Sequence, residues 1–352
     1  MRPARDTFLN PLASLALCVA GAVLFVLLKT PLPWMIGPLV VMAAMNFSGA
    51  RLRAPRVARP AGQVIVGTAL GLYFTPEVAR QVLTYWHLLL LAALLAILIA
   101  CACAWFLNTV TDTDRTTAFF ASVPGGAAEM SVLAERFGAR TDRVAIAQSM
   151  RILAVVVVIP FALTYSGVHG ADVYAPATAE LDWGRLGLLL AIAATGAGLL
   201  ALLGAPNAFM LGALFSVIGL TVAEVSFSAM PPLVSNAGQL LIGCALGGRF
   251  ERSFLDRVPR FVAATLGSIL IAMALAAALG TALAWAYGLP VPSVVLATAP
   301  GGIAEMCITA KVLQLGVPLV TAAHVTRVIV LVTGTGMLFR VARRLAERFR
   351  KA

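Results

Sequence analysis

The sequence predicts an all-α polytopic membrane protein with about ten transmembrane helices in two inverted five-helix repeats. Three observations support this prediction: an apolar composition, apolar segments of near-spanning length, and a duplicated block that contains a helix break. Of the 352 residues, 61% are hydrophobic and 12% are charged, whereas soluble domains carry about 25% charged residues. We therefore treat residues 1–352 as one membrane domain, whose principal partner is the lipid bilayer.

Ten apolar segments are expected to form the membrane helices. They are 11–28, 34–47, 61–74, 86–107, 144–164, 186–203, 208–223, 233–247, 261–287 and 319–339. A spanning helix needs about 20 residues, so 34–47 and 61–74 are short for a full crossing. The first segment lacks a small-residue cleavage site, which favours a helix over a signal peptide.

The positive charges indicate an orientation rather than a nucleic-acid partner. The formal net charge is +11, and the basic residues lie in short loops and at the C-terminus, as the positive-inside bias produces. This distribution predicts cytoplasmic N- and C-termini in a bacterial inner membrane. The longest polar connection, about 165–185, is too short for a DNA-binding module.

A tandem duplication covers most of the chain. GQVIVGTALGLYF (62–74) aligns with GQLLIGCALGGRF (238–250) at a displacement of 176 residues. The same displacement superposes PGGAAEM (124–130) on PGGIAEM (300–306) and Arg151 on Arg327. We divide the chain into repeat 1 (about 11–165), an outer loop (about 166–184), repeat 2 (about 185–340) and a basic cytoplasmic tail (341–352).

The charges of the loops favour inverted repeats. If each Pro-Gly-Gly segment crossed the membrane, the arginine-rich loop 249–260 would lie outside and the acidic loop 165–184 inside, against the bias. If each segment is a re-entrant hairpin, each repeat has an odd number of crossings, and both loops fall on the favoured side. Re-entrant and fully crossing segments both remain open.

The Pro-Gly-Gly segments are the first candidate site. Proline removes a backbone donor and glycine frees the backbone to turn, and such irregular backbone is tolerated at membrane depth only inside protein or beside a watery cavity. The candidate residues are Pro124, Gly125 and Gly126 in repeat 1, and Pro300, Gly301 and Gly302 in repeat 2. Inverted repeats with broken helices are typical of secondary transporters.

An acid follows each break: Glu129 and Glu305 fall in the first turn of the next short helix. The free N–H groups of such a turn can hold an anion. Each glutamate either caps its own helix or binds a proton or a cation. Pseudo-symmetry predicts that the two acids approach one central site.

Polar residues recur in the helix after each break. Gln148 and Arg151 share one helix face, and His324 and Arg327 hold the equivalent places. The arginines either form salt bridges with Glu129 and Glu305 or, if those acids do not neutralise them, bind a substrate carboxylate or phosphate.

Gln63 and Gln239, each beside a glycine in a glycine-rich segment, are weaker candidates. The alternative interpretation is that these segments form a packing surface of small residues between helices.

The duplicated PGG-x-AEM block, the GQ-x4-ALG segment and the WMIGPL entry (34–39) resemble the bacterial AbrB membrane family, also labelled ammonia monooxygenase. The resemblance covers nearly the whole chain. GLYFTPE (71–77), followed by the break, is distantly similar to the bile-acid-symporter and cation/proton-antiporter superfamily. That resemblance implies a transport site formed by broken helices. The glutamate after each break departs from the symporters, which leaves the substrate and the coupling ion open.

The expected function is secondary transport by alternating access, of a small organic anion coupled to H⁺ or Na⁺. The alternative is a membrane sensor that affects gene expression indirectly. An enzymatic role is not expected, because His87, His169 and His324 lack metal-ligand spacing. No cofactor is expected, and a homodimer would suit an elevator-like motion.

Overall fold

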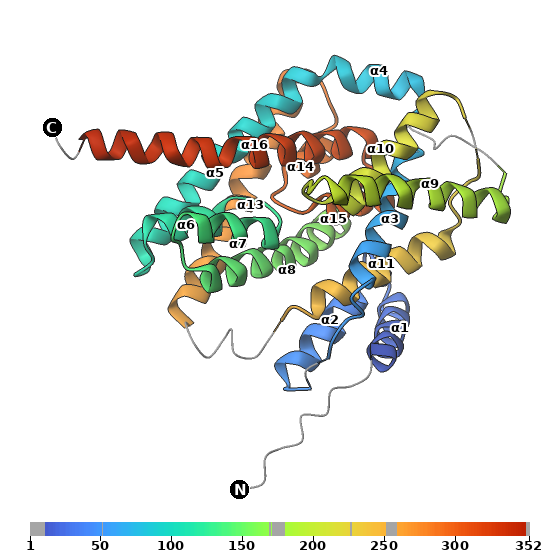
Figure 1. Ribbon diagram of the computed structural model, residues 1–352, viewed down its shortest axis with the longest axis horizontal. Coiled ribbons are helices and arrows are strands. Elements are labelled where there is room, and N and C mark those ends of the chain that lie inside the picture. Colours follow the sequence, from blue (N-terminus) through green and yellow to red (C-terminus); the bar gives the residue numbers. More distant parts are fainter. Residues whose placement is uncertain are drawn as a thin grey trace, which may run out of the picture.

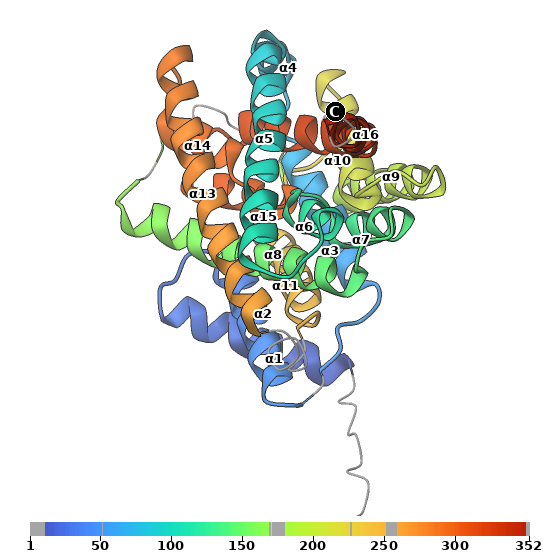
Figure 2. The same ribbon diagram turned by 90° about the vertical axis from the view of Figure 1, so that its left-hand side faces the viewer.

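The computed structural model describes residues 11–50, 52–168, 170, 180–225, 227–250 and 259–349, and every regular element in these ranges is a helix (Figure 1, Figure 2). The helices of the first half are α1 (Pro11–Leu27), α2 (Pro33–Phe47), α3 (Ala58–Gly71), α4 (Pro76–Thr84), α5 (Trp86–Val110), α6 (Arg115–Ser122), α7 (Ala127–Arg136) and α8 (Thr141–Tyr165). The helices of the second half are α9 (Trp183–Leu202), α10 (Ala208–Val222), α11 (Pro232–Gly247), α13 (Pro259–Tyr287), α14 (Val291–Thr298), α15 (Ile303–Leu313) and α16 (Val317–Phe349). The predicted all-α class is confirmed.

Each of the ten predicted apolar segments forms a helix. Within the described ranges, five helical segments are long and apolar enough to cross a membrane: α5, α8, α9, α13 and Val317–Gly334 of α16. Helices α1, α2, α10 and α11 are apolar but shorter. At 1.5 Å per residue, 15 residues span about 22 Å of a hydrocarbon core of about 30 Å. The chain is therefore a polytopic membrane protein, and the full count of crossings stays a prediction.

Two predicted loops and the predicted tail fall partly outside the described residues. These comprise most of the outer loop about 166–184, residues 251–258 of the basic loop 249–260, and the last three residues of the tail. Within the described part of the tail, α16 continues as a helix to Phe349.

The helix bounds follow the displacement seen in the sequence. Helices α6 and α14 have eight residues each, and α14 begins 176 residues after α6. The pairs α7 and α15, and α8 and α16, begin at the same displacement. Upstream the backbone repeats at a displacement of 175 residues, because α2 and α10 are each preceded by a left-handed residue, Leu32 with φ 52° and Asn207 with φ 48°.

Helices α1–α3 and α9–α11 pack together and are called the crossed bundle below. At its centre α3 crosses α11 (Figure 1), where a Cβ atom at Gly62 would lie 2.7 Å from the carbonyl oxygen of Gly238. The two glycines are equivalent in the repeats, so the crossing is nearly symmetric. Gln63 and Gln239, the weaker candidates, are buried beside these glycines, which is consistent with a packing surface of small residues.

Helices α5–α8 and α13–α16 form a second group, called the hairpin bundle below, in which α5 runs beside α13 (Figure 2). Helices α6 and α7 form a hairpin whose ends meet. The Arg140 N–H donates to Thr117 Oγ1 over 2.9 Å, and Arg143 Nη1 donates to Thr113 Oγ1 over 2.8 Å. The residues that precede α6 and those that follow α7 therefore lie side by side at the open end of the hairpin.

Candidate functional site

Each Pro-Gly-Gly segment separates two short helices, because α6 ends at Ser122 before α7, and α14 ends at Thr298 before α15. The glycines make room for the residues that follow them. A Cβ atom at Gly125 would lie 2.6 Å from the Met130 side chain, and one at Gly126 would collide with the Glu129 carboxylate. The second break repeats both relations, with Gly301 against Met306 and Gly302 against Glu305. The PGG-x-AEM motif is therefore one packed unit.

The arginines bind the opened backbone. Arg151 Nη1 donates to the Val123 carbonyl over 3.0 Å, and Nη2 donates to the Gly125 carbonyl over 2.9 Å. In the second repeat, Arg327 donates to the equivalent carbonyls of Ala299 and Gly301. The last carbonyls of a helix lack intrahelical donors and carry partial negative charge. Each arginine supplies the donors and the charge that the interrupted helix needs.

The residue one turn earlier continues this pattern. Gln148 Nε2 donates to the Phe120 and Val123 carbonyls, each over 2.9 Å. His324 Nε2 lies 3.1 Å from the Leu296 carbonyl oxygen, to which it donates. Both side chains are fully buried. The two repeats thus use different chemical groups for one contact.

The salt-bridge alternative, in which Arg151 pairs with Glu129 and Arg327 with Glu305, is wrong for the described residues, in which neither arginine forms an ion pair. The reason is that the two charges serve different helix ends. The guanidinium groups lie on the carbonyl ends of α6 and α14, whereas the carboxylates lie on the amino ends of α7 and α15. The hairpin is fastened to the next helix, but through backbone acceptors.

The glutamates lie at the positive ends of their helices. Glu129 and Glu305 are third residues of α7 and α15, and each carboxylate folds back over the glycine that precedes the helix. Glu129 Oε1 also accepts the N–H of Asn207, over 3.4 Å, at the start of α10. Glu305 is 7% exposed, and its carboxylate makes no hydrogen bond or ion pair with a described residue.

The two breaks meet inside the hairpin bundle. Pro124, Arg151, Pro300 and Arg327 line one cavity of about 20 Å³, to which α5 and α13 contribute apolar side chains. This volume holds about one water molecule. The opened backbone of both repeats therefore borders one pocket in the hairpin bundle, an arrangement compatible with irregular backbone at membrane depth.

Arg249, which follows α11, is a charged residue of the site that the sequence analysis counted only as an orientation signal. Burial and, to a smaller extent, the nearby Arg59 lower the pKa of Arg249 to about 10, and Glu305 and Glu129 partly oppose that change. Arg249 therefore stays protonated at neutral pH and lies within electrostatic reach of both glutamates. The sequence did contain a signal for this role. Arg249 follows the duplicated GQ-x4-ALG segment directly, and its counterpart in the first repeat is the uncharged Tyr73.

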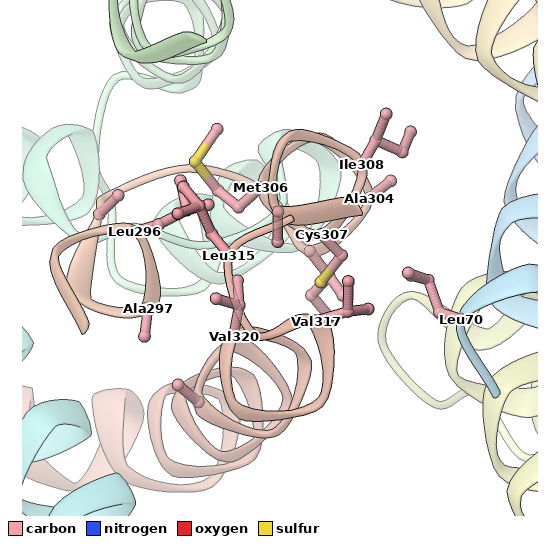
Figure 3. Packing of buried hydrophobic residues seen from close by; sticks show 14 of the residues in the cluster. Leu70, Leu296, Ala297, Ala304, Met306, Cys307, Ile308, Leu315, Val317 and Val320 are labelled. Atoms are coloured by element: carbon pink, nitrogen blue, oxygen red, sulfur yellow. The ribbon is translucent and has the colours of Figure 1, made fainter. Parts of the chain in front are cut away.

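The two hairpins differ in exposure. Val132 of α7 is 54% exposed, whereas its counterpart Ile308 of α15 is 2% exposed. Figure 3 shows Ile308 and Ala304 on the side of α15 towards α3, which carries Leu70, whereas Cys307 lies towards α16. Lys311 Nζ donates to Ser235 Oγ over 3.3 Å at the start of α11. Helix α15 is thus packed against the crossed bundle, and α7 is open on one side.

The remaining predicted features are mostly apart from the breaks. His87 packs against the Trp86 and Tyr287 rings, and His169 lies outside the described residues. Among the residues that the structure describes, no three side chains of His, Cys, Asp or Glu are grouped as metal ligands would be.

Comparison with known proteins gives one family. The family described as "Transition state regulatory protein AbrB" matches residues 34–343. "Uncharacterized protein YhjN" of Bacillus subtilis (strain 168) is 28% identical, with 97% of this chain and 95% of that protein aligned. "Putative regulator AbrB" of Escherichia coli (strain K12) is 26% identical, with 90% of this chain and 93% of that protein aligned. The chain belongs to the AbrB family.

Proposed function

We propose that this protein is a secondary transporter of small organic anions, acting by alternating access in the bacterial inner membrane. The observation that carries the proposal is the meeting of the two breaks, with Pro124, Pro300, Arg151 and Arg327 around one cavity. Paired broken helices place substrate sites near the midplane in many transporter folds. An anion is favoured because the amino ends of α7 and α15, together with Arg249, make the surroundings of the glutamates positive.

The unequal exposure of α7 and α15 supports a moving hairpin bundle. Inverted repeats have equivalent contacts available on both faces of the membrane, and a transporter uses one set at a time. In this state α15 is packed and α7 is open. With both termini inside, the open face is cytoplasmic, and each broken helix is a re-entrant hairpin that enters from its own side.

The proposed topology has an inexpensive test. Single cysteines replacing Arg140 and Gln314, which are exposed and follow α7 and α15, should react with a membrane-impermeant maleimide from opposite faces. Labelling of both positions from one face would reject the inverted arrangement.

The proposed activity is tested by flux. Proteoliposomes containing the full chain should take up ¹⁴C-labelled carboxylates from a panel of acetate, pyruvate, succinate and citrate, with saturation and competition among the substrates. Vesicles carrying Arg151→Gln protein are the control, because this change removes the break's support. Uptake equal to that of empty vesicles for the whole panel would reject anion transport.

A sensor or regulatory protein is the second candidate, and the printed names of the family and of one relative, both regulators, favour it. Such a protein would bind its ligand at the same breaks and alter gene expression indirectly. Saturable binding of a panel compound by the purified protein, with no flux in proteoliposomes, would select the sensor. We propose no enzymatic role for either candidate.

A further inference from the structure

We propose that the two glutamates couple transport to protons, because each carboxylate and a carboxylate of the substrate occupy the same helix amino end by turns. This inference rests on the proposed function and names its coupling ion. In the anion-free state Glu129 and Glu305 hold the amino ends of α7 and α15. In the loaded state each glutamate is protonated, and the anion takes its place.

The first step is geometric. Each carboxylate folds back over a glycine, Gly126 or Gly302, at the amino end of its helix. The three atoms nearest to a Cβ added at either glycine all belong to the glutamate, so the carboxylate occupies the space that a side chain would take at the amino end of the helix. An incoming anion that uses those N–H groups has to displace the carboxylate.

The second step is that the carboxylates are not held by cations. Glu305 is more than nine-tenths buried and makes no hydrogen bond or ion pair with a described residue. Arg151 and Arg327 use both Nη atoms of each guanidinium group on carbonyls of the breaks. When the negative group of an incoming anion arrives at the same helix end, the two like charges repel each other, and a proton on the glutamate removes that repulsion.

The third step excludes sodium. The groups that face Glu305 include Arg151 from α8, Arg249 after α11, and the neighbouring Cys307 thiol. Arg249 also faces Glu129, which in addition accepts an N–H at the start of α10. Two helix amino ends and these arginines make a positive environment. A sodium ion would be repelled there, whereas a proton joins the carboxylate covalently and leaves no separate cation.

The exchange conserves the charge of the site. One glutamate carboxylate takes up one proton from the aqueous side that faces the site, and one carboxylate group of the substrate binds in its place. On the other side the substrate leaves, the proton returns to water, and the carboxylate folds back over its glycine. A monocarboxylate carries one proton, and a dicarboxylate that reaches both amino ends carries two.

The test measures binding and proton uptake separately from flux. The purified full-length protein is titrated with acetate, pyruvate, succinate and citrate at pH 5.5 and pH 8, and protons are counted in weakly buffered solution. We expect binding with proton uptake, and a Kd that rises by up to about tenfold per pH unit for each coupled proton. Replacing sodium with choline should leave the Kd unchanged.

Variants assign the protons. Glu305→Gln and Glu129→Gln mimic the protonated state. Each variant should bind the anion at pH 8 at least as well as the native protein, and should take up one proton fewer on binding. The double variant should bind independently of pH. Glu77→Gln is the matched control, because Glu77 also lies in a first helical turn, that of α4, but is exposed.

The outcomes separate the two proposals. Failure of the whole panel to bind the native protein at pH 5.5, binding without proton uptake, or a requirement for sodium would each overturn proton exchange. Proton-coupled binding with no flux in proteoliposomes would retain the exchange and reject the transporter. If the glutamine variants fail to fold, the proton count of the native protein alone decides.

Discussion

At the scale of the residue, the site depends on charges that face helix ends rather than each other. Arg151 and Arg327 lie on carbonyl ends, and Glu129 and Glu305 lie on amino ends. At each break, an arginine therefore compensates the negative carbonyl end of one helix, and a glutamate compensates the positive amino end of the next. This arrangement leaves the carboxylates available for chemistry and leaves the arginines as fixed supports.

Arg151→Gln should lower the free energy of unfolding by about 3 kcal/mol, because two charge-assisted hydrogen bonds to buried carbonyls are lost and glutamine replaces them incompletely. Chemical unfolding of the protein in detergent micelles measures the change. Arg136→Gln, an exposed position on α7, is the control and should change stability by less than about 0.5 kcal/mol. Equal small losses would contradict the supporting role of Arg151.

Gly126→Ala should preserve the fold and impair transport. The added methyl group meets the Glu129 carboxylate, the mobile end of a side chain, which can swing away at a cost of about 1 kcal/mol. Displacement of that carboxylate removes it from the amino end of α7. Flux measurements and a thermal unfolding curve, taken on one preparation, should show lost uptake with a nearly unchanged Tm.

Sequence reasoning located the two breaks and left the partners of the arginines open between the glutamates and a substrate anion. The sequence placed Arg151 in the helix that follows the first break. It gave no means of knowing that the arginine reaches carbonyl groups, since backbone acceptors leave no trace in residue type. Arg249 was overlooked for a related reason: positive-inside charges and site charges look alike in a sequence.

At the scale of the element, short helices and close glycine contacts define the architecture. Gly67 of α3 packs on the backbone of α10, where a Cβ atom would lie 2.7 Å from the Met210 carbonyl oxygen. Its counterpart Gly243 of α11 packs in the same way on the Met35 carbonyl of α2. These contacts explain why apolar segments that are short for a full membrane crossing still form helices, because the packed helices stabilise each other.

Gly243→Ala should destabilise the protein by about 1–3 kcal/mol, the usual cost of overpacking, because the added Cβ meets a backbone oxygen that has no rotamer to change. Gly67→Ala should behave alike. Gly198→Ala in α9 has open space around the new methyl group and should be neutral or stabilising by up to about 1 kcal/mol. Thermal unfolding of the three variants compares them directly, and equal behaviour would show that the glycine contacts are unimportant.

The long apolar helices were predictable from the sequence, whereas some of the short helices between them were not. Hydrophobic content located all ten apolar segments. The short amphipathic α4 lies outside those segments, since its polar face carries no membrane signal. Helix α6 was not distinguished because eight residues are too few to establish a period.

At the scale of the whole molecule, the two bundles meet through α15 more closely than through α7. If the bundles move between two states as proposed, the duplication specifies the contacts of the other state. The contact of Lys311 with Ser235 corresponds to one between Glu135 and Arg59, which carry opposite charges. The alternative state would therefore gain an ion pair where the present state has a hydrogen bond.

Paired cysteines test this exchange in a background without the native cysteines. The pair replacing Ser235 and Lys311 should cross-link readily and stop flux until it is reduced. The pair replacing Arg59 and Glu135 should cross-link only in the alternative state, with a yield that changes when a transported anion is added. Absence of cross-linking by the second pair under all conditions would indicate a static hairpin bundle.

The cavity between Pro124 and Pro300 has a bearing on how the duplicated halves can diverge. Its walls come from both copies, with Ala100 of α5 facing the same space as Ala276 of α13, so a larger side chain inherited by one half crowds the break of the other. At this cavity, a substitution in one half therefore constrains which substitutions the other half can accept. Two separately expressed halves should reassemble only when their wall residues are complementary in size. A bulky replacement at Ala100 should be rescued by a smaller residue in the second half, rather than by a second change in the first half.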